Sequence, residues 1–248
     1  MKIANGIYML EISANIMGTS SVINPTLIWD NDTVILIDTG FPGQLPQIRE
    51  AIENVGVSFD KLNLVILTHQ DIDHVGSLST ILKELPNSVK VLSHQEENAY
   101  IQGEKLPVKV AQLEANLNSL PNDLKALYEK LKAFYENNQA KVDKTLTDGE
   151  ELPYCGGITV IYTPGHTPGH ICLYHKQCKI LIAGDALQLD GGELVQAPQS
   201  TNFDRDLSIN SLKMLAKYDI ETVICYHGGL FKDNANQRIA ELANGHLH

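Results

Sequence analysis

The stretch Thr68-His69-Gln70-Asp71-Ile72-Asp73-His74 directly follows the apolar run at residues 62–67. The length of that run and its branched side chains predict a buried strand. Two imidazoles and two carboxylates therefore leave one strand end on a short loop. In an extended loop His69, Asp71 and Asp73 point to the same side, and a turn near Asp73 would let His74 join them or face a second ion. Because all four side chains can bind a metal ion, we call residues 68–74 the metal loop.

The ordinary alternative is a solvated loop, because charged loop residues are usually exposed and a His beside an Asp is usually a surface pair. The rest of the chain repeats the pattern, however. Three more strand-like runs, at residues 158–162, 180–184 and 221–226, are followed by His166, Asp185 and His227. Loops held at strand ends by a sheet are where proteins often place binding groups. The repetition favours a shared metal site over a solvated loop.

The order of these motifs resembles that of the metallo-β-lactamase-fold hydrolases, a superfamily that includes glyoxalase-II-like thioesterases and acyl-homoserine lactonases. The signature His-x-His-x-Asp-His is matched at His69, Asp73 and His74, and Asp71 stands where the family has its second His. The stretch Ile37-Asp38-Thr39-Gly40 follows an early strand, so the resemblance runs through most of the chain. It implies an α/β fold, the four-layer αββα sandwich, with two packed sheets and helices outside.

The resemblance also implies how two divalent ions are held. One ion would be bound by His69, Asp71 and His166, and the second by Asp73, His74 and His227. Asp185 would bridge the two ions. Asp38 would fix the loop or a ligand His through hydrogen bonds. Asp73 is the residue we expect to carry a proton during catalysis, in addition to binding metal.

Asp71 changes the expected chemistry of the first ion. A carboxylate oxygen is an acceptable zinc ligand, so zinc stays the expected metal at both positions. A third carboxylate neutralises more of the ions' charge and predicts a harder first site, more tolerant of manganese or iron. It also predicts weaker attraction for anionic substrates. The alternative is that Asp71 is a surface residue and the first site is weak or empty; the matched position favours ligation.

These residues predict a hydrolase in which a metal-bound hydroxide attacks the carbonyl of an ester, lactone or thioester in a small molecule. Three alternatives remain: a phosphodiesterase or nuclease of the same fold, a redox di-iron protein, and a metal-binding protein without catalysis. The net charge of −11 argues against nucleic acid as a partner, because phosphate binding needs a basic face. A redox relative would carry a flavin domain, for which 248 residues leave no length.

One metallo-hydrolase domain is expected over residues 1–248, with a helical insertion at about 105–143. Seven apolar residues in that insertion recur at spacings of four and three, which is typical of a helix face: Leu113, Leu117, Leu120, Leu124, Leu127, Leu131 and Phe134. Pro121 interrupts the pattern and predicts two helices instead of one. The pair could simply pack on the sandwich, cover the metal cleft, or form a homodimer surface. We slightly favour cleft or partner contact.

Outside these motifs, the patterning predicts the remaining elements. Strands are expected at 6–13, 20–38, 89–92, 169–174 and 179–183, with a hairpin turn at 30–32, and helices at about 44–55, 78–85, 206–217 and 234–243. His94 is expected to cap a helix, His170 to begin a strand and His175 to be a surface or core residue. None of them is expected to bind metal. The same holds for His246 and His248 in the terminal tail.

Composition predicts the compartment. The four cysteines show no Cys-x-x-Cys spacing, so reduced core thiols are expected. Neither a signal peptide nor a membrane-length apolar stretch is evident, so we expect a cytoplasmic protein without membrane association.

Overall fold

The computed structural model describes residues 1–16 and 18–245. The first half of the chain builds a seven-stranded sheet in the order β1-β2-β5-β6-β7-β8-β9. Its strands are β1 (Lys2–Ala4), β2 (Ile7–Met9), β5 (Thr26–Trp29), β6 (Val34–Ile37), β7 (Leu64–Ile66), β8 (Lys90–His94) and β9 (Lys144–Leu146). Strands β6 to β9 run parallel. The hairpin of β3 (Ile12–Ile16) and β4 (Thr19–Ile23) stands apart from this sheet.

The second half builds a six-stranded sheet in the order β10-β11-β12-β13-β16-β17. Its strands are β10 (Glu151–Leu152), β11 (Ile158–Tyr162), β12 (Ile171–His175), β13 (Ile180–Ile182), β16 (Thr222–Cys225) and β17 (Gly229–Phe231). A separate hairpin consists of β14 (Leu187–Asp190) and β15 (Glu193–Gln196). The neighbouring strands β13 and β16 are parallel.

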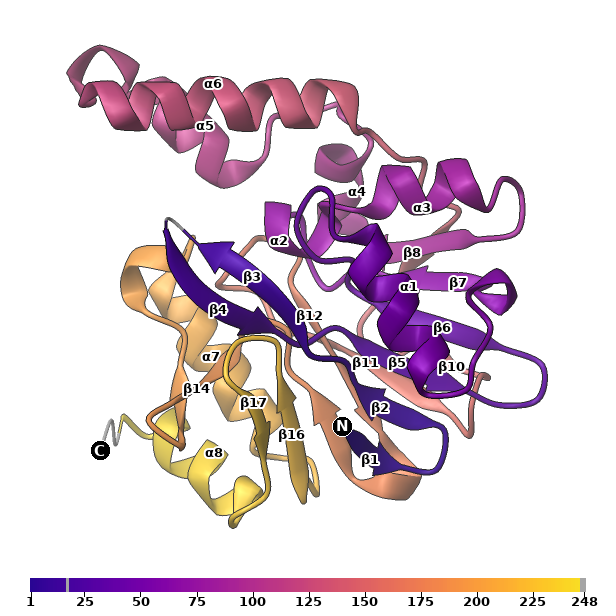
Figure 1. Ribbon diagram of the computed structural model, residues 1–248. Coiled ribbons are helices and arrows are strands. Elements are labelled where there is room, and N and C mark those ends of the chain that lie inside the picture. The colour runs from indigo at the N-terminus through magenta and orange to yellow at the C-terminus, as the bar shows by residue number, and fades with distance from the viewer. Residues whose placement is uncertain (17, 246–248) are drawn as a thin grey trace.

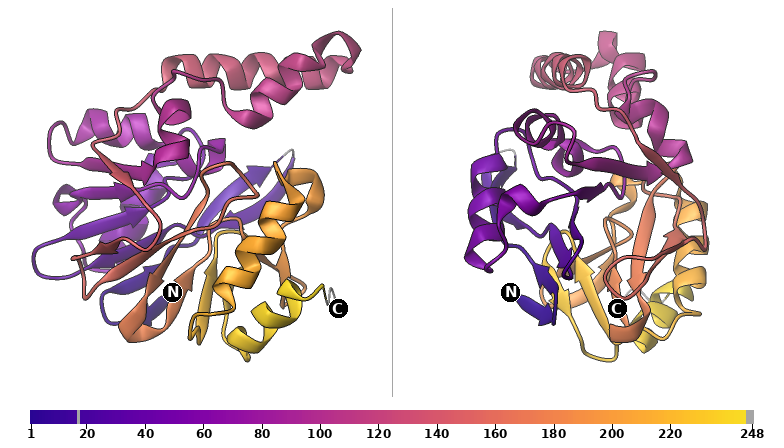
Figure 2. Two further views of the ribbon diagram at one scale, coloured as in Figure 1. Left: turned by 180° about the vertical axis from the view of Figure 1, so that it is seen from behind. Right: turned by 90° about the vertical axis from the view of Figure 1, so that its right-hand side faces the viewer.

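The helices are α1 (Leu45–Asn54), α2 (Ile72–Val75), α3 (Leu78–Glu84), α4 (Gln95–Ile101), α5 (Val108–Ala115), α6 (Asn122–Asn137), α7 (Arg205–Leu215) and α8 (Ala235–Ala243). Short 3₁₀ turns lie at η1 (Phe59–Lys61), η2 (Leu117–Ser119), η3 (Lys176–Cys178) and η4 (Gln199–Thr201). Figure 1 and Figure 2 show α1 and α3 beside the first sheet and α7 and α8 beside the second.

Strand alternation separates the layers of the molecule. In β6, Ile35 and Ile37 belong to the same buried cluster as Leu173 of the second sheet. The residue between them, Leu36, packs in a different cluster with Ile48 of α1. Because successive side chains of a strand point to opposite faces, one face of β6 meets the other sheet and the other face meets a helix.

The second sheet repeats this division. Leu173 of β12 faces the first sheet, while its neighbour Cys172 packs in a cluster with Leu212 of α7 and Ile239 of α8. Two sheets therefore enclose one core, and each covers a second core with its own helices. The expected αββα sandwich is confirmed.

The topology brings several loops to one edge of the sandwich. Parallel strands place their carboxyl ends together, so Asp38 after β6 lies next to the metal loop after β7. In the second sheet, Asp185 and His227 follow the parallel strands β13 and β16. A β-bridge between Ile23 and His227 joins the first hairpin to the second sheet.

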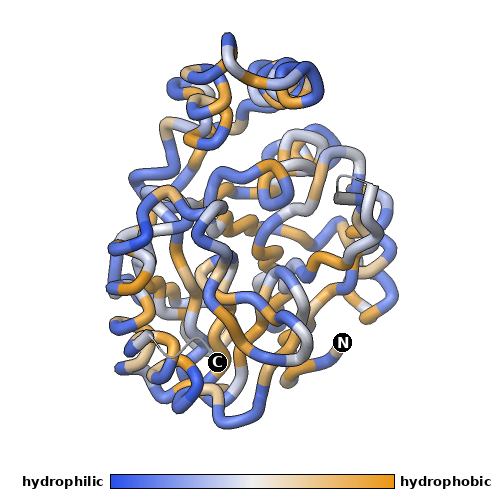
Figure 3. Tube along the Cα trace, turned by 90° about the vertical axis from the view of Figure 1, so that its left-hand side faces the viewer, coloured by the Kyte–Doolittle hydropathy of each residue, from blue (hydrophilic) through white to orange (hydrophobic). Residues whose placement is uncertain are grey.

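The helical insertion consists of two helices, as Pro121 predicted. Pro121 directly precedes α6, and η2 separates that helix from α5. The pair projects beyond the sandwich in both views (Figure 1, Figure 2). Both hydrophobic and hydrophilic residues line these helices (Figure 3), and the seven apolar residues of the stripe are half-buried.

Several segments differ from the sequence prediction. The strand expected at 6–13 is divided between β2 and β3, and β1, β9 and β10 were not predicted. The run at 20–38 forms three strands, because Pro25 has no N–H to continue a ladder between β4 and β5. The hairpin turn at 30–32 is present, with Asp30 Oδ1 accepting from the N–H groups of Asp32 and Thr33. The β14–β15 hairpin was missed. Its two-residue turn is Gly191-Gly192, with both φ angles positive, and this Gly-Gly pair is a hairpin signal readable from sequence.

Candidate metal centre

The metal loop turns near Asp73, at the place where a turn would bring His74 toward a second ion. Helix α2 begins at Ile72, and Asp71 occupies the position before its first residue. This single helical turn redirects Asp73 and His74 relative to His69 and Asp71. The loop therefore presents its four side chains to two neighbouring points instead of one.

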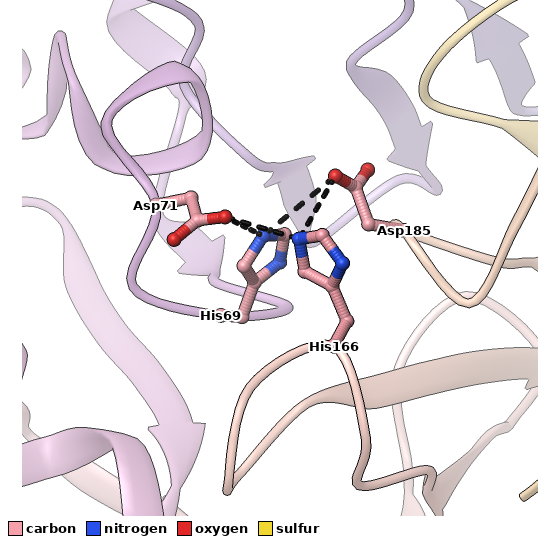
Figure 4. A group of neighbouring side chains, drawn as sticks. All are labelled: His69, Asp71, His166 and Asp185. Atoms are coloured by element: carbon pink, nitrogen blue, oxygen red, sulfur yellow. Dashed lines mark hydrogen bonds and ion pairs between the residues drawn. The ribbon is translucent and has the colours of Figure 1, made fainter. Parts of the chain in front are cut away.

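The first group of side chains contains His69, Asp71, His166 and Asp185 (Figure 4). Nε2 of His166 lies 3.0 Å from Oδ2 of Asp71 and 3.3 Å from Oδ2 of Asp185. Nε2 of His69 lies 3.3 Å from Oδ2 of Asp71. One nitrogen or oxygen from each residue lies within 4.8 Å of the others, so the four could surround one metal ion.

The second group contains Asp73, His74 and His227. Oδ2 of Asp73 lies 3.2 Å from Nε2 of His227 and 3.7 Å from Nε2 of His74. Oδ1 of Asp185 lies 3.3 Å from Nε2 of His74 and 3.5 Å from Nε2 of His227. Asp185 thus turns one oxygen toward each group, which is the arrangement a bridging carboxylate needs.

Unpaired polar atoms test whether a metal ion fits here. Four buried side-chain nitrogens or oxygens in the described residues lack a hydrogen-bond partner, and three belong to this cluster: Nε2 of His69, Nε2 of His74 and Oδ1 of Asp185. Buried polar atoms almost always have partners, because leaving one unpaired costs about 1–3 kcal/mol. Electron pairs from these atoms would be satisfied by a cation, so the residues fit a metal centre.

A hydrogen bond to Asp38 holds the imidazole of His74 in place. Oδ2 of Asp38 lies 2.8 Å from Nδ1 of His74, and its Oδ1 accepts from the N–H of Thr68 at 2.9 Å. Asp38 is buried and has a positive φ of 61°. A bonded Nδ1 leaves Nε2 of His74 free to face the cluster. Asp38 therefore makes the contacts expected of a residue that positions a ligand.

Two further positioning residues were not singled out from the sequence. Oδ1 of Asn202 lies 3.2 Å from Nδ1 of His166. Nε2 of His170 accepts a hydrogen bond from the N–H of Asp185 at 3.0 Å. Burial lowers the pKa of His170 well below its ordinary value, so the ring is neutral and can accept. His170 lies just before β12, as expected, but its role behind Asp185 had no sequence signal.

Charges within the cluster shift its protonation. Burial raises the pKa of Asp185, but His227, His74 and His166 lower it by more, leaving it well below the usual range. Burial lowers the pKa of His227, but Asp185 and Asp73 raise it to about 10. A metal ion would therefore have to displace protons from imidazole, and metal binding should strengthen as pH rises.

Lys109 of α5 reaches this cluster and was also missed. Its Nζ donates to Oδ2 of Asp71 and lies 3.1 Å from Nε2 of His166. Burial lowers the pKa of Lys109, but Asp71 raises it by more, so the side chain is an ammonium. No periodic pattern marks such a contact in sequence, because Lys109 is 38 residues from Asp71.

Gln70 and Glu97 connect the metal loop to its surroundings. Oε1 of Gln70 accepts from the N–H of Val108 at 2.8 Å, and its backbone oxygen accepts from the Tyr135 hydroxyl at 3.0 Å. Nε2 of Gln70 donates to Oε2 of Glu97 at 2.9 Å. Both helices of the insertion are therefore bonded to the residue between His69 and Asp71.

Glu97 also holds the loop that carries His166. Its Oε1 accepts from the Thr167 hydroxyl and from the N–H of Gly169, each at 2.7 Å. Burial raises the pKa of this carboxyl to about 7, despite its three donors. A buried carboxyl of α4 thus fixes two loops of the metal centre against each other.

Comparison with known protein families gives a match that spans the candidate ligands. The family model described as the metallo-beta-lactamase superfamily matches residues 18–227, a span that includes all seven candidate ligands. The chain belongs to the metallo-beta-lactamase superfamily. The expected membership is confirmed, and with it the expectation of a metal-dependent hydrolase.

Relatives in this superfamily cover most of the chain. An uncharacterised protein, YobT of Bacillus subtilis, is 29% identical over 83% of each chain. The probable metallo-hydrolase YflN of Bacillus subtilis is 29% identical over 85% of this chain and 81% of its own. The hydroxyacylglutathione hydrolase GloC of Haemophilus influenzae is 26% identical over 83% of this chain and 85% of its own. A metallo-beta-lactamase family protein of Thermus thermophilus shares the fold, with a TM-score of 0.75 and 24% identity. The match covers 98% of this chain and 80% of the Thermus chain.

Histidines expected to have no metal-binding role include His94 and His175, and both have hydrogen-bond partners outside the two groups. Nδ1 of His94 accepts from the N–H of Glu96 and caps α4, as expected. Buried His175 bonds to the backbone oxygen of Cys155, while His246 and His248 lie outside the described residues. All four cysteines are free thiols, two of them buried. None of the described helices combines the length and apolarity that crossing a membrane requires.

Proposed function

We propose that this protein is a dinuclear metal-dependent hydrolase that cleaves an ester, lactone or thioester bond of a small molecule. The placement of Asp185 carries the proposal, because its two oxygens face separate groups of candidate ligands. In this proposal one ion is held by His69, Asp71 and His166, the other by Asp73, His74 and His227, with Asp185 shared.

Two divalent ions so held would supply a hydroxide nucleophile near neutral pH and polarise the substrate carbonyl. The chain's own residues prepare for this. Asp38, Asn202 and His170 fix the ring orientations and the Asp185 backbone through the hydrogen bonds described above. Such support keeps the ligand atoms in place before substrate arrives.

Asp73 is the residue we assign to proton transfer. Its Oδ2 lies 3.2 Å from Nε2 of His227, and its side chain is 16% exposed, more than Asp71 or Asp185. A carboxylate at the open side of the site can take a proton from an attacking water and deliver it to a leaving group. The protein supplies this step with no residue beyond the ligand set.

Zinc is the ion we propose for both positions, because imidazole-rich sites with carboxylate oxygen suit it. The oxygen of Asp71 makes manganese or iron acceptable at the first position. A cytoplasmic location, one metallo-hydrolase domain over 1–248, and a homodimer formed through the helical insertion remain predictions.

Thioesters are the first class to test, because GloC is named a hydroxyacylglutathione hydrolase and matches most of both chains. Esters and lactones share the same carbonyl chemistry. A phosphodiesterase or nuclease of this fold, and a metal-binding protein without catalysis, are the alternatives that the test must separate.

The test combines elemental analysis with a panel of thioesters, esters, lactones and phosphodiesters. We expect about two ions per chain and turnover of at least one acyl substrate. Asp185→Ala should lose both ions or keep one weakly, and should lower the rate by about 100-fold or more, because even residues behind a ligand cost 10–100-fold. Asp190→Ala, at an exposed position of β14, is the control.

Phosphodiester hydrolysis without acyl hydrolysis would replace the proposal by the nuclease alternative. Two ions without turnover of any substrate would favour a binding protein. Unchanged metal content in Asp185→Ala would contradict the bridging role.

A further inference from the structure

Lys109 brings a positive charge into the metal centre from the helical insertion. Its Nζ donates to Oδ2 of Asp71 and lies 3.1 Å from Nε2 of His166. These are atoms that the proposed function assigns to the first ion. The lysine side chain is 38% exposed, whereas the side chain of Asp71 is 11% exposed. Lys109 therefore reaches from the solvent side of the site toward its interior.

The position of this lysine is fixed by buried hydrogen bonds. The N–H of the preceding residue, Val108, donates to Oε1 of Gln70, which is itself 1% exposed. Gln70 is held in turn by Glu97 and by the hydroxyl of Tyr135. The start of α5 is thus anchored to the metal loop, and the residue that follows the anchor is the one that enters the site.

Lys109 also offsets the charge of Asp71. A carboxylate in place of a neutral imidazole lowers the net charge of the first ligand set by one. The ammonium group adds that charge back within hydrogen-bond distance. The attraction for anions that Asp71 removes is therefore restored from a different element of the fold.

One of these two acceptors, Nε2 of His166, cannot serve both an ion and Lys109. Nε2 of His166 has a single lone pair in the plane of the ring, which is used either by a proton donor or by a metal ion. Once that lone pair serves an ion, the ammonium group has lost an acceptor beside a centre of positive charge. An anion from solvent or substrate is the partner that restores its hydrogen bonding.

We propose that Lys109 is the anion-recognition residue of this site and binds a carboxylate carried by the substrate near its scissile bond. The inference rests on the proposed acyl hydrolysis and names its substrate class, a singly charged acyl compound. One ammonium offsets one negative charge, so a singly charged group is preferred over a neutral one.

The test uses two 4-nitrophenyl esters, the hemisuccinate and its neutral succinamic analogue. The purified metal-containing protein should show a lower KM for the anionic ester. Lys109→Met should raise that KM relative to the neutral ester by about tenfold to a hundredfold, the usual range for one charge-assisted hydrogen bond. Lys109→Arg should keep most of the preference. Lys130→Met, at an exposed position of α6, is the matched control and should change neither KM.

A second readout does not depend on turnover. Calorimetry should show succinate binding to the metal-containing protein more tightly than succinamide, and Lys109→Met should remove most of that difference. Elemental analysis of each variant reports the metal content. An unchanged KM ratio together with unchanged succinate affinity in Lys109→Met would overturn the proposal. So would loss of metal with unchanged succinate affinity per bound ion, which would limit Lys109 to neutralising Asp71.

The two proposals fail in different ways. If the wild-type protein hydrolyses neither ester nor any other acyl substrate, the proposed function falls, and succinate binding still decides the role of Lys109. If both esters are hydrolysed with no preference that depends on Lys109, the function stands and the anion-recognition role is excluded.

Discussion

Asp71 accepts a hydrogen bond from Lys109, and this contact changes the expected effect of Asp71 substitutions on metal binding. From sequence alone, Asp71→His would be expected to raise zinc preference, because it would complete the family's usual ligand set. In the structure the same change would leave the ammonium group of Lys109 beside the imidazole of His166 without its carboxylate. An unpaired cation next to a cation site opposes metal binding.

We therefore predict that Asp71→His alone binds zinc more weakly at the first position than the wild-type protein does. The double variant Asp71→His/Lys109→Met should recover the affinity, because the uncompensated charge is gone. Zinc titration with a competing chelator measures the zinc affinity of four proteins: the wild type, the two single variants Asp71→His and Lys109→Met, and the double variant. Additive effects of the two changes would show that the two side chains do not interact.

The buried carboxyl of Glu97 leads to a second prediction, about how the stability of the fold depends on pH. Burial raises the pKa of Glu97 from 4.5 to about 7. The folded state therefore keeps its proton to higher pH than the unfolded state. The contribution of Glu97 to the free energy of unfolding is therefore fully present below pH 4.5. It is lost as the pH rises toward about 7, and above that pH it no longer changes.

Glu97→Gln removes this titration. Between pH 4.5 and 8 the variant should gain up to about 3 kcal/mol of unfolding free energy relative to the wild-type protein. Urea denaturation at several pH values measures the difference, in which the titration of the metal ligands cancels. Glu96→Gln, at an exposed neighbouring position, is the control. A pH-independent difference for Glu97→Gln would show that Glu97 is ionised throughout.

At the scale of elements, the insertion is joined to the metal loop by both of its helices. Val108 of α5 and Tyr135 of α6 each bond to Gln70. The hydroxyl of Tyr128, by contrast, donates to Glu114 within the helical pair itself. Two tyrosines on the same helix thus offer a matched comparison.

Tyr135→Phe should release α6 from the metal loop at a cost of about 1 kcal/mol, the usual worth of a hydrogen bond. We expect faster hydrogen exchange in α6 and a changed KM, with metal content retained. Tyr128→Phe should speed exchange in the pair with little effect on KM. Equal effects of both variants on KM would mean that the hydrogen bond between Tyr135 and Gln70 has no specific influence on substrate binding.

At the scale of the whole molecule, the candidate ligands come from both halves of the sandwich. The metal loop follows β7 of the first sheet, while His166, Asp185 and His227 follow strands of the second. Ions held between them would cross-link the two sheets. Metal binding should therefore stabilise the entire fold.

Removing metal with a chelator should lower the midpoint of thermal unfolding. At free metal of about 100 times the dissociation constant, one site contributes about 2.7 kcal/mol, which corresponds to roughly 5–10 °C for a chain of this size. Differential scanning calorimetry before and after chelation, and after zinc is restored, measures the effect. A midpoint that does not move would argue against ions between the sheets.

The half-buried apolar stripe of α5 and α6 supports a further prediction about assembly. We expect these helices to pair with those of a second copy, because the part of an apolar helix face that stays accessible to solvent favours association. Sedimentation velocity should show a dimer that Leu127→Glu, on the stripe, converts to a monomer. The exposed α6 position Glu129→Gln is the control. A wild-type monomer at high concentration would exclude this interface.

The candidate ligands and the sandwich were predictable from apolar runs followed by His or Asp residues, together with a motif order that resembles the metallo-β-lactamase superfamily. Alternating or continuous apolar runs mark strands, and His or Asp residues after those runs fall at one sheet edge wherever neighbouring strands are parallel. That rule locates the metal loop, Asp185 and His227. His166 follows β11, which is antiparallel to both of its neighbours, so its place among the candidate ligands came from the order of the motifs. The β14–β15 hairpin was also within reach, through its Gly-Gly turn.

The contacts that tune the site were decided only by tertiary structure. Lys109, Asn202 and Glu97 reach the centre from a helical insertion, the end of a 3₁₀ turn and a helix that no periodicity ties to the metal loop. The sequence by itself determined which side chains are candidate ligands, since their residue types and their order along the chain suffice for that. Only the docking of distant elements determined the net charge and the hydrogen bonds around them, because electrostatic effects depend on distances in space.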